Sequence, residues 1–303
     1  MKKPLILLST LLGFLFLISL FLDLRIFTGQ TILVGDSLYY EDPSLRSFAE
    51  DVFTTHPSNF VMDVDNNLFN YPFLQYAQKS FERGEIPWWN PYVAMGIPFV
   101  GLGSGVFDPV AALAGLLAPP AKLTNVIAVL GLWIVAFGMF LFLGVLGMSL
   151  PARIFGAAAF TFSGWTIVYL GRQNFMAEIW MPWIFWAAER LIQKRCLARM
   201  GLFALFCGLV CLPGHLQTSL HIFTALSLYV LFRLLQEKRS PNASVGLVLS
   251  FALAPYIGNW YRTDSDYSIR RSPQPAQSSS CRTKHPGKGG RYMVWNPARY
   301  HRR

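Results

Sequence analysis

Long apolar runs alternate with shorter polar stretches along most of the chain. Runs of membrane-spanning length, or close to it, cover residues 4–22, 124–147, 154–170, 176–191, 200–213, 217–235 and 244–258. A helix needs about 20 apolar residues to cross a bilayer. The pattern therefore predicts an all-α polytopic membrane protein with about seven transmembrane helices. Composition agrees, because 53% of residues are hydrophobic, 14% are charged, and the mean hydropathy is +0.37.

Residues 23–104 form the longest polar stretch and contain two predicted amphipathic helices. Asp42 is a good N-cap for the first, with Pro43 at its first helical position. The second begins at Pro72 and stops at Gly84. These helices either lie on the membrane with their apolar faces down or pack on each other as a small cap.

Basic residues set the expected orientation, because cytoplasmic loops are rich in Lys and Arg. The clusters are Lys2/Lys3, Arg153, Arg190/Lys194/Arg195/Arg199 and Arg233/Lys238/Arg239. Placing all of them inside puts the N-terminus in the cytoplasm and residues 23–104 outside. This holds only if the apolar segment 105–118 does not cross, so we expect a re-entrant or interfacial helix there. The first run is either a signal peptide or, as its length favours, an uncleaved anchor.

Carboxylates are prominent in the outer loop. The pattern Asp-x6-Pro occurs twice, at Asp36 and at Asp65, and Asp63 lies beside the second copy. A carboxylate at a membrane surface can act as the general base that deprotonates an acceptor hydroxyl. An Asp near a helix start is equally an ordinary capping residue, so both roles stay open. Asp63 and Asp65 are also the candidate ligands for a divalent metal, although no spacing demands one.

The same expected side carries further polar residues at the ends of spans. Arg172 and Asn174 lie in one connection, and His215 and Gln217 in another. Arg172 or His215 is a candidate contact for a lipid phosphate. We expect Glu178 and Asp108 at a similar depth in the membrane, near its outer face. Each is either a functional carboxylate or an ordinary residue at a helix start.

An aromatic string from 84 to 98 reads GEIPWWNPYVAMGIP. Its Trp89, Asn90 and Tyr92 either contact a sugar ring or belong to an interfacial aromatic belt. The sequence has no Gly-rich nucleotide loop, no zinc spacing and no Gly-x-Ser-x-Gly elbow, which argues against a nucleotide-sugar donor.

These motifs resemble the YfhO family of bacterial membrane proteins, which are placed among the GT-C glycosyltransferases. The resemblance covers about residues 1–255 and rests on Asp65 with Pro72 seven residues on, the aromatic string, Gly96-Ile97-Pro98-Phe99, Asn174-Phe175 and Gly214-His215-Leu216-Gln217. Phe69 stands where the family prefers Gln, and Leu216 replaces a Pro. Asp36 fits the same pattern, so either Asp is the equivalent residue.

The resemblance implies transfer of a sugar from a polyprenyl-phosphate carrier to a cell-wall polymer or lipid, at the outer face of the bacterial inner membrane. It implies Asp65 or Asp36 as the base, in some relatives with Mg²⁺ or Mn²⁺. The partners are then the lipid-linked sugar, the acceptor and membrane lipid, and not nucleic acid. The alternatives are a transporter or flippase of lipid-linked intermediates, and an inactive fragment of such an enzyme.

The character of the chain changes near residue 255. Residues 259–303 contain ten Lys and Arg against two Asp, and this segment supplies +8 of the chain's net charge of +10. Its Arg-, Ser- and Pro-rich composition predicts disorder. It is either a basic tail on anionic lipid or, as the expected exit on the outer side favours, the product of a frameshift after residues 1–258.

Overall fold

The computed structural model describes residues 2–22, 31–32, 69–99, 105 and 107–236. Most of these residues are helical. Several predicted features lie outside the described residues. They are Asp36, Asp63, Asp65, the first amphipathic helix at Asp42, the span at 244–258 and the tail at 259–303.

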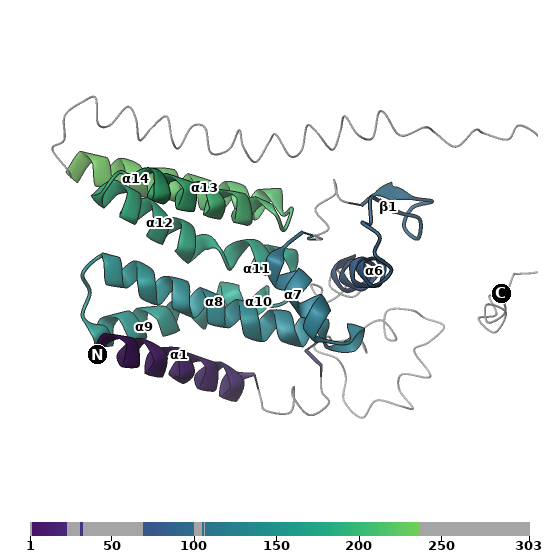
Figure 1. Cartoon of the computed structure of the whole chain (residues 1–303), viewed down its shortest axis with the longest axis horizontal. Coiled ribbons are helices and arrows are strands. Elements are labelled where there is room, and N and C mark those ends of the chain that lie inside the picture. Colours follow the sequence, from purple (N-terminus) through teal and green to yellow (C-terminus); the bar gives the residue numbers. More distant parts are fainter. Residues whose placement is uncertain (1, 23–30, 33–68, 100–104, 106, 237–303) are drawn as a thin grey trace, which may run out of the picture.

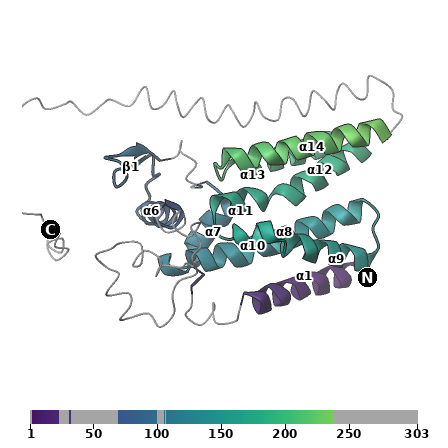
Figure 2. The ribbon, with the colours of Figure 1, turned by 180° about the vertical axis from the view of Figure 1, so that it is seen from behind.

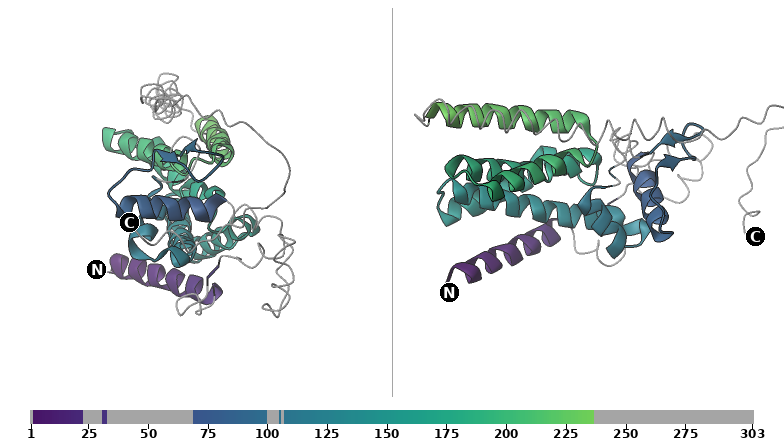
Figure 3. Two further views of the ribbon diagram at one scale, coloured as in Figure 1. Left: turned by 90° about the vertical axis from the view of Figure 1, so that its right-hand side faces the viewer. Right: turned by 45° about the horizontal axis from the view of Figure 1, so that its top comes forward.

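The body of the molecule is a bundle of helices that run back and forth along one direction (Figure 1). Its members are α1 (Lys2–Phe21), α8 (Leu123–Val145), α9 (Leu150–Thr161), α12 (Met181–Gln193), α13 (Leu197–Cys211) and α14 (Leu216–Gln236). Helices α1 and α14 flank the layer that contains α8 and α12 (Figure 3, right). In the described part of the chain, two helices are long and apolar enough to cross a membrane, at Pro120–Val145 and Leu216–Gln236.

Two of the expected spans are not continuous helices. The run at 154–170 divides into α9 and the short α10 (Gly164–Val168), and the run at 176–191 divides into α11 (Gln173–Glu178) and α12. Pro182 explains the second break, since it has no N–H to donate and its ring clashes with the carbonyl four residues earlier, that of Glu178. At the first break Ser163 caps α10, with Oγ accepting from the Thr166 N–H at 3.4 Å.

Helix α8 is the centre of the bundle because small residues on it admit large neighbours. A Cβ at Gly131 would lie 2.5 Å from the Phe175 ring, and one at Gly138 would lie 2.6 Å from the Trp183 indole. The Trp183 indole N–H donates to the Ile134 carbonyl at 3.0 Å. Small residues on one helix therefore let α11 and α12 approach α8 closely.

The ends of the bundle differ. One end carries α6 (Tyr71–Glu82), β1 (Trp89–Asn90), β2 (Ile97–Pro98), α7 (Pro109–Leu117) and the 3-10 turn η3 (Pro120–Lys122). The N-terminus, the α8–α9 turn and the α12–α13 turn lie at the other end, as the view from behind also shows (Figure 2). There Gln193 Nε2 donates to the Val145 carbonyl at 3.1 Å. The described basic residues that we expect to be cytoplasmic therefore lie at one end, away from α6 and the strands.

Helix α7 occupies the segment expected to be re-entrant or interfacial. Its nine residues extend about 14 Å at 1.5 Å per residue, well short of a bilayer core of about 30 Å.

Helix α6 lies where the second amphipathic helix was predicted. Figure 1 looks along α6, whereas α8, α12 and α14 run across the view, so α6 lies crosswise to the bundle. A crosswise amphipathic helix is the arrangement expected of an interfacial helix.

Candidate functional site

The aromatic string folds into a small β-hairpin at the α6 end. Trp89 pairs with Pro98 and Asn90 with Ile97 in antiparallel register. Asn90 is 2% exposed, and its Oδ1 accepts from the Tyr92 N–H at 3.0 Å. Asn90 therefore shapes the turn, and its described contact is with the backbone rather than with a ligand.

Helix α6 holds this hairpin through an aromatic cluster. The ring of the fully buried Phe99 lies nearly perpendicular to the rings of Phe73 and Tyr76, each with ring centres 5.1 Å apart. The Tyr76 hydroxyl donates to the Trp89 carbonyl at 2.7 Å. The Trp89 indole covers Gly96, where a Cβ would lie 2.6 Å from the ring. Trp89 and Tyr92 nevertheless remain exposed, at 52% and 83%.

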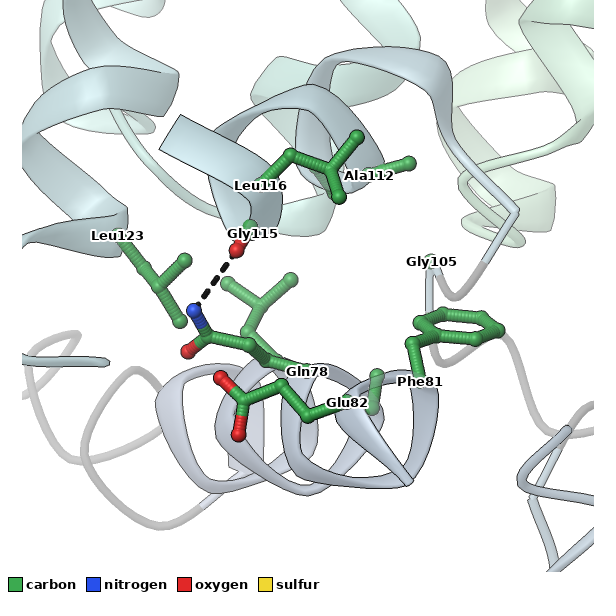
Figure 4. A pocket seen from close by; sticks show the side chains of 11 residues that line it. Gln78, Phe81, Glu82, Gly105, Ala112, Gly115, Leu116 and Leu123 are labelled. Atoms are coloured by element: carbon green, nitrogen blue, oxygen red, sulfur yellow. Dashed lines mark hydrogen bonds between the residues drawn. The ribbon is translucent and has the colours of Figure 1, made fainter. Parts of the chain in front are cut away.

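A cavity of about 270 Å³ lies between α6 and α7 (Figure 4). Its lining is mostly apolar, from Leu74, Ala77, Phe81, Ala111, Ala112, Leu116 and Leu123, with Gln78 and Glu82 as the polar side chains. Gln78 Nε2 donates to the carbonyls of Gly115 and Ala118, both at 2.8 Å, and so joins the two helices. Within the described residues Gln78 Oε1 is buried and has no hydrogen-bond partner.

Asp108 lies fully buried at the start of α7. Its Oδ1 accepts from the Val110 N–H at 3.0 Å and the Ala111 N–H at 2.9 Å, and its Oδ2 accepts from the Trp180 indole at 3.3 Å. Burial raises the pKa of this carboxyl to about 6, against the opposing effect of these hydrogen bonds. Asp108 thus acts as an N-cap that also ties α7 to the α11–α12 junction.

Arg172 and Asn174 lie at the start of α11. Arg172 is 7% exposed, and its guanidinium is 5.9 Å from the centre of the Tyr169 ring. Gly171, with φ +77°, packs against Thr124 at the start of α8. Arg172 therefore lies near the α8 end that carries η3, but mostly buried. Asn174 is half-buried.

His215 caps the start of α14. Its Nδ1 accepts from the Thr218 N–H at 3.2 Å and lies 2.8 Å from Thr218 Oγ1. Burial and the nearby His221 lower the pKa of His215, which favours a neutral ring with its proton on Nε2. His215 is therefore suited to donate a neutral hydrogen bond from Nε2, rather than to form the charged phosphate pair considered from the sequence. Gln217 is exposed.

The structure brings several of these segments together. Gly105, just before α7, lies close to Met176 in α11 and to the Pro213 carbonyl beside the His215 turn. Thus the α7 start, α11 and the α13–α14 turn meet at the end of the bundle that also carries α6. Asp36, Asp63 and Asp65 lie outside the described residues, so their distance from this group stays a prediction.

A second polar group was only partly anticipated. Glu178 is 5% exposed, its Oε1 accepts from Thr166 Oγ1 at 3.1 Å, and Ser163 Oγ lies 2.9 Å from the same hydroxyl. The Trp165 side chain also interacts with this carboxyl. In the described part of the chain Glu178 Oε2 has no hydrogen-bond partner. The sequence singled out Glu178, but not Thr166 or Ser163, because their proximity depends on two helix breaks that meet in space.

Among the described residues no group of three His, Cys, Asp or Glu side chains is placed to hold a metal. The predicted metal ligands, Asp63 and Asp65, are outside that set. Comparison of the chain with family models, with curated proteins and with solved structures found no match.

Proposed function

We propose that this protein is a GT-C-type membrane glycosyltransferase, resembling the YfhO family, that uses a polyprenyl-phosphate-linked sugar. One observation carries the proposal. The aromatic hairpin, an apolar cavity and the segments with Arg172 and His215 gather at a single end of a bundle that has two helices of membrane-spanning length.

The cavity between α6 and α7 suits the lipid part of such a donor. Its apolar lining matches an isoprenoid chain, and its polar side chains, Gln78 and Glu82, belong to α6. Trp89 and Tyr92 are exposed at the same end. Of the two roles that the sequence left open for them, contact with a sugar ring or an interfacial position, the transfer proposal requires neither. His215 Nε2 and Asn174 are the candidate donors to the phosphate, and buried Arg172 contributes positive charge behind them.

Asp65 or Asp36 would remove the proton from the acceptor hydroxyl as it attacks the anomeric carbon. The bond from that carbon to the phosphate oxygen then breaks, and the polyprenyl phosphate leaves with the electron pair. The leaving group is already an anion, so positioning and charge stabilisation are the main demands on the protein. In the proposal a divalent metal, if used, is held by Asp63 and Asp65.

The test is a transfer assay with the purified protein in lipid vesicles, using polyprenyl-phosphate sugars and a cell-envelope acceptor. Asp65→Asn or Asp36→Asn should reduce transfer by about 100-fold or more, in the range of a lost general base. Glu85→Gln, a change of the same type at an exposed residue outside the cavity lining, is the control and should alter transfer little. If both Asp variants retain full transfer, the assignment of the base is wrong.

A lipid-linked intermediate transporter is the second candidate, and a specific observation favours it. Interrupted helices that meet around a buried carboxylate, as at Glu178 and Thr166, are a recurring feature of transport sites. Vesicles loaded with a fluorescent lipid-linked sugar separate the two proposals. Movement of the lipid-linked sugar across the bilayer without its consumption supports transport. Consumption of the lipid-linked sugar supports transfer. If the sugar is neither moved nor consumed, the result supports the inactive fragment.

A further inference from the structure

The hairpin exposes several large apolar side chains. This surface, called the hairpin tip below, consists of Ile86, Trp88, Trp89, Tyr92 and Met95. Their exposed fractions are 48%, 57%, 52%, 83% and 102%. Exposed apolar residues that occur singly need no explanation, but five on one short hairpin, with two Trp and one Tyr among them, indicate an interaction surface.

The tip is presented by a rigid base. The Phe99 N–H donates to the Trp88 carbonyl at 2.8 Å, and the buried Phe99 ring anchors the hairpin on α6. At the turn Ala94 and Met95 adopt φ of +48° and +63°. Left-handed conformations cost a non-glycine residue on the order of 1 kcal/mol. One of these two residues, Met95, has the most exposed side chain of the tip.

The hairpin tip has no charged residue, and the charged residues closest to it along the chain come directly before it. Arg83 and Glu85 form an exposed ion pair at 3.1 Å, at the base of the hairpin. From residue 86 to residue 107 the sequence has no Asp, Glu, Lys, Arg or His. A surface that binds a soluble protein or a nucleic acid normally has charged or polar residues around its apolar centre. An uncharged tip rich in Trp and Tyr instead matches the headgroup region of a bilayer.

The placement of the hairpin agrees with that partner. The hairpin rests on α6, which lies crosswise at one end of a bundle containing two helices of membrane-spanning length. If those helices cross the bilayer, α6 lies roughly in its plane and the hairpin lies at the level of the lipid–water boundary. Figure 3 shows the hairpin and α6 at this end, beyond the helices of the bundle.

We propose that the hairpin tip inserts into the lipid interface and anchors the α6 end of the protein at the membrane surface. The ligand is bilayer lipid, bound through apolar and aromatic contact. This inference needs no sugar-transfer activity, so it stands or fails separately from the proposed function.

Site-directed spin labelling tests the insertion directly. The full chain, with its four cysteines replaced by Ser, would carry one nitroxide at Met95→Cys and be reconstituted in phosphatidylethanolamine–phosphatidylglycerol vesicles. Collision with O₂, which partitions into lipid, is compared with collision with a water-soluble nickel chelate. Glu85→Cys is the matched control, because it lies in the same segment on the charged base. Tyr92→Cys provides a second label on the tip.

Insertion predicts an O₂-to-nickel collision ratio several-fold higher at positions 95 and 92 than at position 85. Equal ratios at the three positions would overturn the proposal, because the tip would then be in water. Protection of positions 95 and 92 from both reagents would also overturn it, since protein and not lipid would cover the tip. In detergent-free nanodiscs of the same lipids the ordering should be unchanged.

Discussion

Asp108 is a buried carboxylate whose described contacts are structural. From sequence alone it was one of several carboxylates expected near the outer face. In the structure its two oxygens satisfy two backbone N–H groups of α7 and the Trp180 indole, so its described bonds are structural. His215 and Asn90 likewise use side-chain atoms on nearby backbone. These contacts stabilise the turns on which the candidate site depends.

Asp108 gives stability a pH dependence whose sign is fixed by burial. Its pKa in the folded protein is about 6, above the ordinary value of 3.8. The folded state therefore holds the proton more tightly, so the contribution of this carboxyl to stability is fully present below about pH 4 and is lost as the pH rises through about 6. At 1.36 kcal/mol per pKa unit the loss from this group approaches about 3 kcal/mol. Asp108→Asn should remove this decline in the thermal midpoint, measured in detergent from pH 4 to 7.

The asparagine variant retains an oxygen for the cap but presents an amide to the Trp180 indole, which costs on the order of 1 kcal/mol. Its midpoint should therefore be lower at pH 4, the acid end of the measured range, but depend less on pH. Glu82→Gln, at an exposed position, should keep the pH profile of the original protein. An unchanged decline in Asp108→Asn would show that another group is responsible.

At the scale of elements, close approach to α8 depends on glycine. The Phe175 ring and the Ile179 side chain occupy the space where a Gly131 side chain would be, with Cβ distances of 2.5 and 2.8 Å. Both neighbours are fully buried and have little room to move. Helix packing therefore depends on individual positions that periodicity describes only as apolar.

Gly131→Ala should destabilise the bundle by about 1–3 kcal/mol through overpacking. Gly208→Ala on α13 is the matched control, because no atom lies within 4 Å of its Cβ. There the substitution should be neutral or add up to about 1 kcal/mol from helix propensity. Thermal midpoints in detergent measure both, and equal effects at the two positions would contradict the packing argument.

Helices α12 and α14 are joined by a buried ionic contact. Glu189, whose side chain is 1% exposed, accepts from Arg233 at 2.7 and 3.0 Å and from the Tyr229 hydroxyl at 2.8 Å. Glu189→Met alone leaves a cation without its partner and should cost about 2–4 kcal/mol. The double variant with Arg233→Leu should recover most of that loss. A double-mutant cycle on unfolding midpoints checks this, and strict additivity would argue against coupling.

The whole molecule has two chemically different ends. The described basic residues expected to be cytoplasmic, the N-terminus and the α12–α13 turn lie at one end. Helix α6, the hairpin and the His215 turn lie at the other end, which also has Lys79, Arg83 and Arg172. The positive-inside rule predicts that these ends face opposite sides of the membrane. This assignment is a prediction about the cell, while the separation of the ends is a property of the fold.

Cysteine labelling tests the sidedness. Exposed Cys196 lies in the basic turn and is kept as the single thiol of one variant. Glu85→Cys, with all four native cysteines replaced by Ser, places a single thiol at the α6 end. A membrane-impermeant maleimide should label position 85 in intact spheroplasts and Cys196 only in inverted vesicles. The reverse pattern would invert the orientation, and labelling of both in spheroplasts would argue against a protein that spans the membrane.

The sequence by itself determined the helical, apolar character of the chain, because these depend on composition and periodicity. It also located α6 between Pro72 and Gly84 and the segment of α7, where Pro and Gly give local stop signals. It did not resolve the interruptions at Ser163 and Pro182, because both lie within runs that are predominantly apolar.

Only the tertiary structure decided which polar atoms are already satisfied. Asn90, Asp108 and His215 are bonded to nearby backbone, whereas Glu178 meets Thr166 across two helix breaks. It also placed Trp89 over Gly96 and left Met95 exposed on a strained turn. The physical reason is that hydrophobic periodicity identifies which face of an element is apolar. The partner of that face, and the hydrogen bonds left free for a ligand, depend on contacts between segments distant in the sequence.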